Sequence, residues 1–357
     1  MPELRRDPVV GYWTIISTER GRRPVEYRPR QSQSETHECP FCEGYEAMTT
    51  TEITSIRRSG TKKDAPGWEV RTILSKVPIL SNLKPQIDRY GIGLYDVMDG
   101  VGQHEIIIES PKHKHDLDEL SIPEIEKVVR MYVSRFTELE RDDRFEYSLL
   151  FKNHGHVSGA PQDIVRHSRS QLISMPVTPK RIKEELLSCK MHFEKHQRCV
   201  FCDILRQERK EDSRIVAEND SFFCFCPFAS RSPFEMWIVP KKHAADFGRL
   251  PESDFAGFAE ILKTSLAKLR ILLEDPPFNF ILHTAPYRHS SIESRWQGLE
   301  HYYHWFLQIS PRMTRSAGFE WGTGIHINPT PPEDAAYLLR QVDGHPHPQE
   351  HSHAPVS

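Results

Sequence analysis

One set of cysteine and histidine residues occurs twice along this chain, in the same order. Each set consists of a Cys-x-x-Cys pair, a single histidine and a His-x-x-x-Gln stretch. The sets are Cys39–Cys42, His113 and His167–Gln171 in the first half, and Cys199–Cys202, His243 and His304–Gln308 in the second. An internal repeat of this length indicates that the chain is a duplication of one structural unit.

The length of the chain agrees with a duplication. Its 357 residues suffice for two domains that each bury a core. We expect a first domain over residues 1–178 and a second over residues 179–343. Residues 344–357 are rich in histidine and proline, and we expect this tail to be disordered.

The charge and hydropathy of the chain exclude several classes of protein. A net charge of -3 provides no overall attraction for nucleic acid. The sequence contains no run of 18 or more apolar residues, so no membrane-spanning helix is predicted. The N-terminus has no apolar signal region. We therefore expect a cytoplasmic protein that binds neither nucleic acid nor membrane.

Short strands with a few helices are predicted, which is an α+β pattern. The expected strands are 12–17, 70–74, 104–109, 147–152, 171–175, 222–225, 235–239, 279–283 and 301–309. The expected helices are 121–142, 179–196, 253–273 and 332–342. The first of these helices begins with a Ser-x-x-Glu capping box at Ser121 and Glu124.

A Cys-x-x-Cys pair brings two thiolates to one ion, as tetrahedral zinc requires. Two histidines from distant strands would complete a Cys2His2 site in each half. A single pair could also be a redox dithiol, but two equivalent pairs favour zinc. Because four protein ligands leave no open position, such zinc would be structural. We expect the remaining cysteines, Cys189, Cys224 and Cys226, to be buried free thiols.

The stretch His167-Ser-Arg-Ser-Gln171 is the candidate site for chemistry. Alternate side chains of a strand share a face, so His167, Arg169 and Gln171 would point one way, and Ser168 and Ser170 the other. The preceding segment contains Asn153 and small residues whose backbone N–H groups could approach a phosphate. These features together predict a phosphate-binding face.

Several longer motifs carry a family resemblance. They are Arg20–Pro24, Cys39–Cys42, His104–His113, Asn153–Ala160, His167–Gln171, Phe228–His243, Tyr303–Gln308, Pro311–Arg312, Ala317–Gly324 and Ile327–Pro329. In these motifs the chain resembles the galactose-1-phosphate uridylyltransferases and the related ADP-glucose phosphorylases of the histidine-triad superfamily. The resemblance implies an α+β fold of two tandem histidine-triad-like units, each an antiparallel sheet with flanking helices, related by pseudo-twofold symmetry.

The resemblance also implies metal ligands and an activity. Two structural zinc ions would be bound by Cys39, Cys42, His113 and His167, and by Cys199, Cys202, His243 and His304. Family members transfer a nucleoside monophosphate from a nucleotide sugar to a sugar phosphate or inorganic phosphate, as in UDP-glucose and galactose metabolism. Gln171 would bind the phosphate, and the implied substrate contacts are Arg20, Arg23, Asn153, Ser158, Gly159, Glu320 and Asn328. A homodimer is one option for the assembly.

The chain departs from the family pattern at Arg169, where the nucleophilic histidine is expected. A guanidinium has no lone pair and cannot form the covalent intermediate. The link at residues 161–166 is also about three residues longer than in the family, Pro161 replaces a small hydroxyl residue, and Ser75 replaces an asparagine. A register shifted by two would instead make His167 the nucleophile and remove it from the zinc site.

Three functional hypotheses follow. The first is a nucleotidyltransferase or nucleotide-sugar phosphorylase in which Arg169 binds the phosphate and the acceptor attacks directly. The second is the same activity with His167, His154 or His156 as nucleophile. The third is a catalytically degenerate relative that binds nucleotides as a sensor or partner protein.

Overall fold

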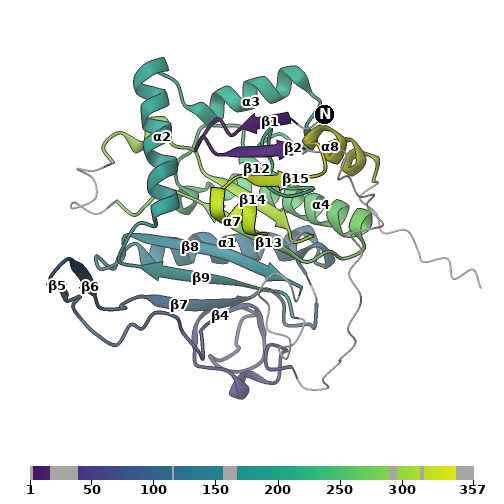
Figure 1. Cartoon of the computed structure of the whole chain (residues 1–357). Helices are drawn as coiled ribbons and strands as arrows, with labels where there is room; N and C mark the ends of the chain where they lie inside the picture. The colour runs from purple at the N-terminus through teal and green to yellow at the C-terminus, as the bar shows by residue number, and fades with distance from the viewer. Residues whose placement is uncertain are drawn as a thin grey trace, which may run out of the picture.

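A ten-stranded antiparallel sheet forms the centre of the chain (Figure 1). The computed structural model describes residues 3–16, 39–114, 116–155, 167–288, 296–313 and 317–342, so the predicted tail lies outside the described residues. In sheet order the strands are β10 (Ile215–Glu218), β11 (Phe222–Phe225), β12 (Met236–Pro240), β14 (Phe306–Pro311), β13 (Phe278–His283), β8 (Tyr147–His154), β9 (Arg169–Met175), β7 (Gln103–Ile108), β4 (Trp68–Leu74) and β3 (Glu52–Arg57).

The strand order repeats outwards from the central β8–β13 pair, as the duplication predicts. One half runs β8-β9-β7-β4-β3 and the other runs β13-β14-β12-β11-β10. Gln171 pairs with Phe151 and Ile106, just as Gln308 pairs with Ile281 and Trp237. The predicted α+β fold with a repeated antiparallel unit is therefore confirmed. The two units share one continuous sheet because β8 pairs with β13.

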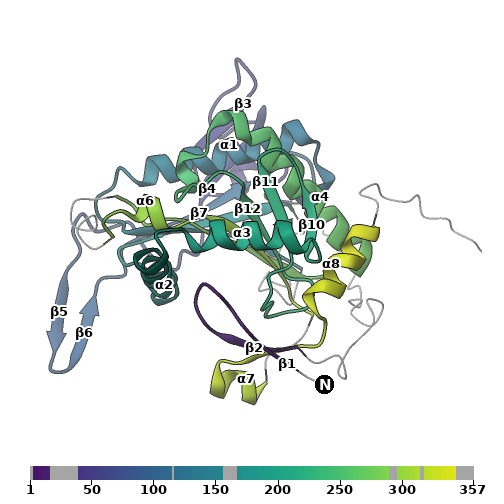
Figure 2. The ribbon, with the colours of Figure 1, turned by 90° about the horizontal axis from the view of Figure 1, so that it is seen from above.

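Helices cover the two faces of the sheet differently (Figure 2). On one face α1 (Ile122–Leu139) and α4 (Phe255–Leu273) lie together and enclose the largest apolar core. On the other face α2 (Lys180–His196) and α3 (Val200–Glu211) pack on the C-terminal half through a second core. The remaining helices are α6 (Leu299–Tyr302), α7 (Gly318–Thr323) and α8 (Pro332–Gln341), with 3-10 turns at Glu46–Met48, Leu117–Glu119, Phe247–Arg249 and Glu252–Asp254.

The N-terminal strands belong to a separate small sheet. Its members are β1 (Glu3–Arg6), β2 (Trp13–Ile16) and β15 (His326–Asn328), with β15 parallel to β2. Residues near the start of the chain therefore pair with residues of its last sixth. The proposed unit boundary between residues 178 and 179 falls between β9 and α2, and it stays a prediction.

Most predicted elements occur, and one strand begins later than expected. The strand predicted over 301–309 is instead α6 followed by β14, so His304 lies in the connection before the strand. Gly298 has a φ of 74°, which allows the turn that starts α6. The capping box at α1 is confirmed, since the Ser121 N–H donates to the Glu124 carboxylate at 2.8 Å.

An apolar hairpin projects from the body of the molecule at the left of Figures 1 and 2. It consists of β5 (Arg89–Ile92) and β6 (Tyr95–Met98). Leu94, in the turn between β5 and β6, is fully exposed, and Leu83, which precedes β5, is 91% exposed. Single exposed apolar residues are common on proteins, but a run of them on one projecting arm is typical of an interaction surface.

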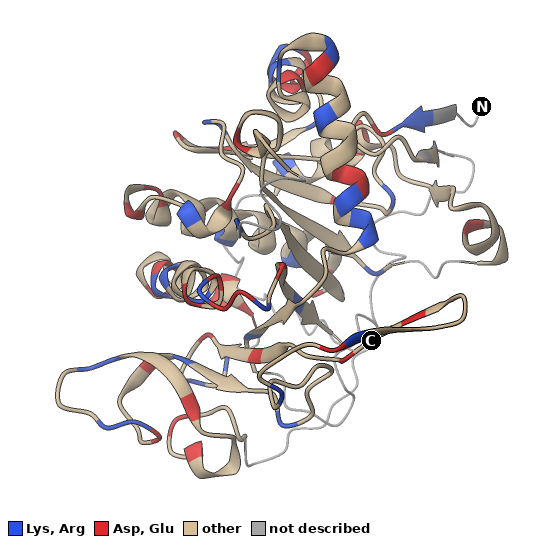
Figure 3. Cartoon of the chain, turned by 90° about the vertical axis from the view of Figure 1, so that its left-hand side faces the viewer, with Lys and Arg blue, Asp and Glu red and all other residues tan. Residues whose placement is uncertain are grey.

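Acidic and basic residues are interspersed over the helices and loops (Figure 3). The mixture agrees with the small net charge of -3. No helix among the described residues has the length and apolar character needed to cross a bilayer.

A buried carboxylate joins three strands and α1 beneath the candidate site. Glu109, directly after β7, accepts hydrogen bonds from Tyr132 Oη and Lys152 Nζ, both at 2.6 Å. It also accepts from the hydroxyls of Ser168 and Ser170. Burial raises the pKa of Glu109, but the ammonium of Lys152 and the two serine hydroxyls lower it by more. The pKa of Glu109 therefore lies below the usual range of a glutamate. Glu109 is therefore a fully bonded anion.

We expect Glu109→Gln to reduce the free energy of unfolding by about 3–5 kcal/mol, because Lys152 loses its closest buried counter-charge. Chemical denaturation would measure the change. Glu138→Gln is the matched control, since Glu138 pairs with Arg141 on the surface, and its loss should cost below about 1 kcal/mol. Equal midpoints for the two variants would contradict the role of Glu109.

Candidate functional site

The first predicted ligand set converges in space. The four ligand atoms of Cys39, Cys42, His113 and His167 all lie within 4.8 Å of one another. His167 Nδ1 lies 3.4 Å from Cys39 Sγ, and His113 Nδ1 lies 3.5 Å from Cys42 Sγ. This group has the composition and proximity of a four-ligand metal site.

The second predicted set converges in the same way. The ligand atoms of Cys199, Cys202, His243 and His304 also lie within 4.8 Å of one another. Nδ1 of His243 lies 3.3 Å from Cys202 Sγ, and Nδ1 of His304 lies 3.8 Å from it. The two clusters therefore repeat with the fold. The three other cysteines are buried free thiols, as predicted.

The histidine rings are oriented as metal ligands. Nε2 of His167 donates to the Ser110 carbonyl at 2.8 Å, and Nε2 of His304 donates to the Pro240 carbonyl at 3.0 Å. Nε2 of His243 donates to the Glu300 carbonyl at 2.8 Å. A proton held on Nε2 leaves the Nδ1 lone pair directed at the sulfurs. Burial lowers the pKa of His167 to about 4, which keeps the imidazole neutral, as a metal ligand must be. Both clusters could hold a metal ion.

The orientation of His167 bears on the shifted alignment. Its Nδ1 faces the cysteines and its Nε2 is bonded to a carbonyl, so neither nitrogen points to the face that carries Gln171. His154 lies on the opposite face of β8 from Phe151, the strand partner of Gln171, and binds Asp275 at 2.7 Å. His156 lies outside the described residues. The geometry favours His167 as ligand over His167 as nucleophile.

Gln171 is held by a histidine that sequence reasoning left without a role. His104 Nδ1 accepts from the Ile79 N–H at 3.4 Å, so Nε2 carries the proton and donates to Gln171 Oε1 at 2.9 Å. Burial lowers the pKa of His104 and favours this neutral form. With Oε1 engaged, the amide N–H groups of Gln171 are the part of the side chain that could donate to a ligand. The sequence did contain a signal for this contact, because His104 belongs to the motif His104–His113. His104 lies on the same face of β7 as Ile106, and Ile106 pairs with Gln171.

Arg169 lies on the same face, next to the first cluster. Its guanidinium carbon is 5.4 Å from the centre of the Phe41 ring, and Nη1 donates to the His167 carbonyl at 3.2 Å. Burial lowers the pKa of Arg169, yet a guanidinium keeps its proton in proteins. Arg169 and Gln171 thus present a fixed cation and amide donors on one surface, which is a site for an oxyanion.

The equivalent positions in the C-terminal half are closed. Phe306 replaces Arg169 and packs 5.1 Å from the ring of Phe201 in α3. Gln308 is 4% exposed, and its amide donates to Glu235 at 2.7 Å while its oxygen accepts from Arg181 at 3.2 Å. On this face α2 packs only at the ends of β8 and β9, at Tyr147 and Met175, and Arg169 and Gln171 stay partly exposed. Among the described residues, the face at Arg169 and Gln171 is therefore the more open of the two.

The remaining predicted contacts differ in accessibility. Asn153 lies on the same face as Gln171, and its Oδ1 accepts from Asn279 at 2.7 Å. The Glu320 carboxylate accepts the backbone N–H groups of Ala317 and Ile327, both at 3.0 Å. Asn328 is fully buried, and its amide bonds backbone groups of Ser230 and Thr330. These bonds give Glu320 and Asn328 structural roles, and their substrate contacts stay predictions. Arg20, Arg23, Ser158 and Gly159 lie outside the described residues.

Comparison with known proteins agrees with this geometry. Family models for the N-terminal and C-terminal domains of galactose-1-phosphate uridyl transferase match residues 1–169 and 185–353. ADP-glucose phosphorylase of Arabidopsis thaliana is 34% identical over 96% of this chain and 93% of its own length. Galactose-1-phosphate uridylyltransferase of Thermotoga maritima is 27% identical over 96% of this chain and 99% of its own length.

A solved structure extends the similarity to three dimensions. The crystal structure of the Arabidopsis thaliana ADP-glucose phosphorylase, with bound ADP-glucose, superposes with a TM-score of 0.78 at 32% identity. The match covers 96% of this chain and all of that chain. On these matches the chain belongs to the galactose-1-phosphate uridylyltransferase family.

Proposed function

We propose that the chain binds a nucleotide sugar on the open face of β7, β8 and β9 and transfers its nucleotidyl group directly to a phosphate acceptor. The observation that carries the proposal is the shared face of Arg169 and Gln171, beside the first Cys2His2 cluster. The closed equivalent face in the other half supports one such site per chain.

Direct transfer requires no histidine nucleophile. An oxygen of inorganic phosphate or of a sugar phosphate forms a bond to the α-phosphorus. The bond from that phosphorus to the sugar phosphate breaks, and the sugar phosphate leaves with the electron pair. Arg169 and Gln171 would donate to the non-bridging oxygens, where negative charge accumulates in the transition state. Asn153 and the predicted residues Arg20, Arg23, Ser158 and Gly159 would bind the nucleotide.

ADP-glucose is the first substrate to test. The higher identity to an ADP-glucose phosphorylase than to a uridylyltransferase supports it, at 34% against 27%. UDP-glucose with galactose 1-phosphate is the second, which would place the protein in galactose metabolism. The proposal further includes a cytoplasmic location, no nucleic acid partner, and a homodimer. The exposed apolar arm at β5 and β6 supports self-association.

A second function is favoured by the same residue. A guanidinium cannot carry the nucleotidyl group, so Arg169 suits a protein that binds nucleotides without turnover and acts as a sensor or partner protein. The two functions share the binding site and differ only in whether product forms.

Zinc is the metal that we propose for both clusters, one ion in each and two per chain. Two thiolates and two imidazoles match the ligand preference of zinc, and a complete set of four protein ligands favours a structural role. The first ion would fix residues 39–48 and His167 beside Arg169.

We expect Arg169→Ala to weaken binding of ADP-glucose or UDP-glucose at least about tenfold, because a charge-assisted hydrogen bond contributes about 1.5–3 kcal/mol. Isothermal titration calorimetry would measure the dissociation constants. Arg141→Ala is the control, since Arg141 is exposed near the end of α1 and pairs with Glu138 on the surface. An unchanged affinity in Arg169→Ala would remove Arg169 from the site.

Transfer without a covalent intermediate predicts a stereochemical outcome. Incubation with a nucleotide sugar labelled at the α-phosphate should leave no label on the protein, and any product should show inverted configuration at phosphorus. Restoring the family residue with Arg169→His should create or raise covalent labelling. Stable label on His167 of the unaltered protein would support the shifted alignment instead, and binding without product would favour the sensor.

Elemental analysis of the purified protein should give two zinc ions per chain. Cys199→Ser should reduce the content towards one and lower the thermal midpoint, because metal binding is coupled to folding. Cys189→Ser is the control, since Cys189 is an equally buried thiol outside both clusters. Less than one zinc in the unaltered protein would disprove the assignment.

A further inference from the structure

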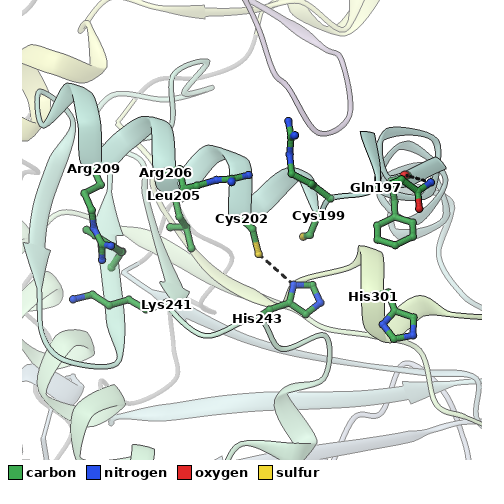
Figure 4. Close-up of a pocket in the computed structure, with 12 residues that line it drawn as sticks. Gln197, Cys199, Cys202, Leu205, Arg206, Arg209, Lys241, His243 and His301 are labelled. Carbon is green, nitrogen blue, oxygen red and sulfur yellow. Dashed lines mark hydrogen bonds between the residues drawn. The ribbon is translucent and has the colours of Figure 1, made fainter. Parts of the chain in front are cut away.

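A cavity of about 470 Å³ lies beside the second Cys2His2 cluster, far from Arg169 in the sequence (Figure 4). One wall is a single face of α3, which carries Cys202, Leu205, Arg206 and Arg209 at helical spacing. The opposite wall includes Lys241 and His243, directly after β12. Its volume is that of a small-molecule site.

Positive charge exceeds negative charge around this cavity. Four cationic side chains line it: Arg198, Arg206, Arg209 and Lys241. Arg198 and Arg206 share one carboxylate, that of Asp203, and Lys241 pairs with Glu218 at 3.0 Å. Four cations against these two acids leave two positive charges uncompensated.

Two of the cations converge on one aromatic ring. The Arg209 guanidinium carbon lies 5.0 Å from the centre of Phe223, and Lys241 Nζ lies 4.8 Å from it. Among the described residues, no carboxylate lies within ion-pair distance of Arg209. Because Lys241 is already paired with Glu218, Arg209 is the cation here whose charge an added anion would neutralise. Figure 4 shows Arg209 and Lys241 directed into the same space.

We propose that this cavity binds the phosphate group of a phosphorylated small molecule, between Arg209 and Lys241. A planar guanidinium forms paired hydrogen bonds to phosphate oxygens, and an ammonium provides a second charge. Phe193 and Leu205 provide an apolar surface for the rest of the molecule. The site is separate from the proposed nucleotide-sugar site and does not depend on that proposal.

Phenyl phosphate is the probe, because it joins a phosphate to a flat apolar group. Titration calorimetry would be done on the full zinc-loaded chain that carries Arg169→Ala. This substitution reduces binding of the probe at the proposed nucleotide-sugar site, so that the measured binding reports on the cavity. In that background phenyl phosphate should bind, and adding Arg209→Ala or Lys241→Ala should each weaken binding about tenfold or more. Thermal midpoints would verify that each variant is folded.

Lys210→Ala is the matched control. Lys210 is the next residue of α3, carries the same charge in the same last turn, is exposed, and does not line the cavity. Its replacement should leave the dissociation constant unchanged. Equal weakening by Lys210→Ala and Arg209→Ala would show a general charge effect and overturn the proposal. No binding in the Arg169→Ala background would overturn it as well.

Discussion

The candidate site depends on the buried carboxylate of Glu109. The hydroxyls of Ser168 and Ser170 donate to it and fix the side of the segment 167–171 that faces α1. His167, Arg169 and Gln171 lie on the opposite side of the same segment. Because strand side chains alternate, the two hydroxyls determine the direction of the three functional side chains. Lys152 of β8 and Tyr132 of α1 complete the set of donors, so the candidate metal ligand His167 and the candidate phosphate-binding residues are positioned from the core.

Duplication gave two equivalent faces, and helix packing distinguishes them. In the C-terminal half, Phe201 of α3 packs against Trp237 and Phe306. The side chain of Gln308 is hydrogen-bonded to Glu235 and Arg181. In the N-terminal half α2 packs only near Tyr147 and Met175, so the same strand position at Gln171 stays partly exposed. The glutamine is thus a structural residue in one unit and a candidate ligand in the other.

Much of this arrangement followed from the sequence because the relevant signals are local or repeated. Alternation placed Ser168 and Ser170 opposite Arg169, and the repeat identified both ligand sets. The features that could not be predicted from the sequence depend on contacts between segments that are far apart in the chain. The pairing of β8 with β13, the closure over Gln308 and the bond from His104 to Gln171 are all set by tertiary packing. The start of β14 was misplaced because apolar Tyr302 and Tyr303 continue a strand-like pattern through α6.

The family resemblance leads us to expect a nucleophilic histidine where Arg169 stands, and the side chains around Arg169 agree with the proposed phosphate site. The amide of Gln171 is still oriented by His104, and His167 still faces the cysteines. A guanidinium in place of an imidazole adds a permanent positive charge beside the amide of Gln171. The cation and the amide both favour binding of an anionic phosphate, so the proposed site keeps the groups needed for recognition, although a guanidinium cannot take part in a covalent step.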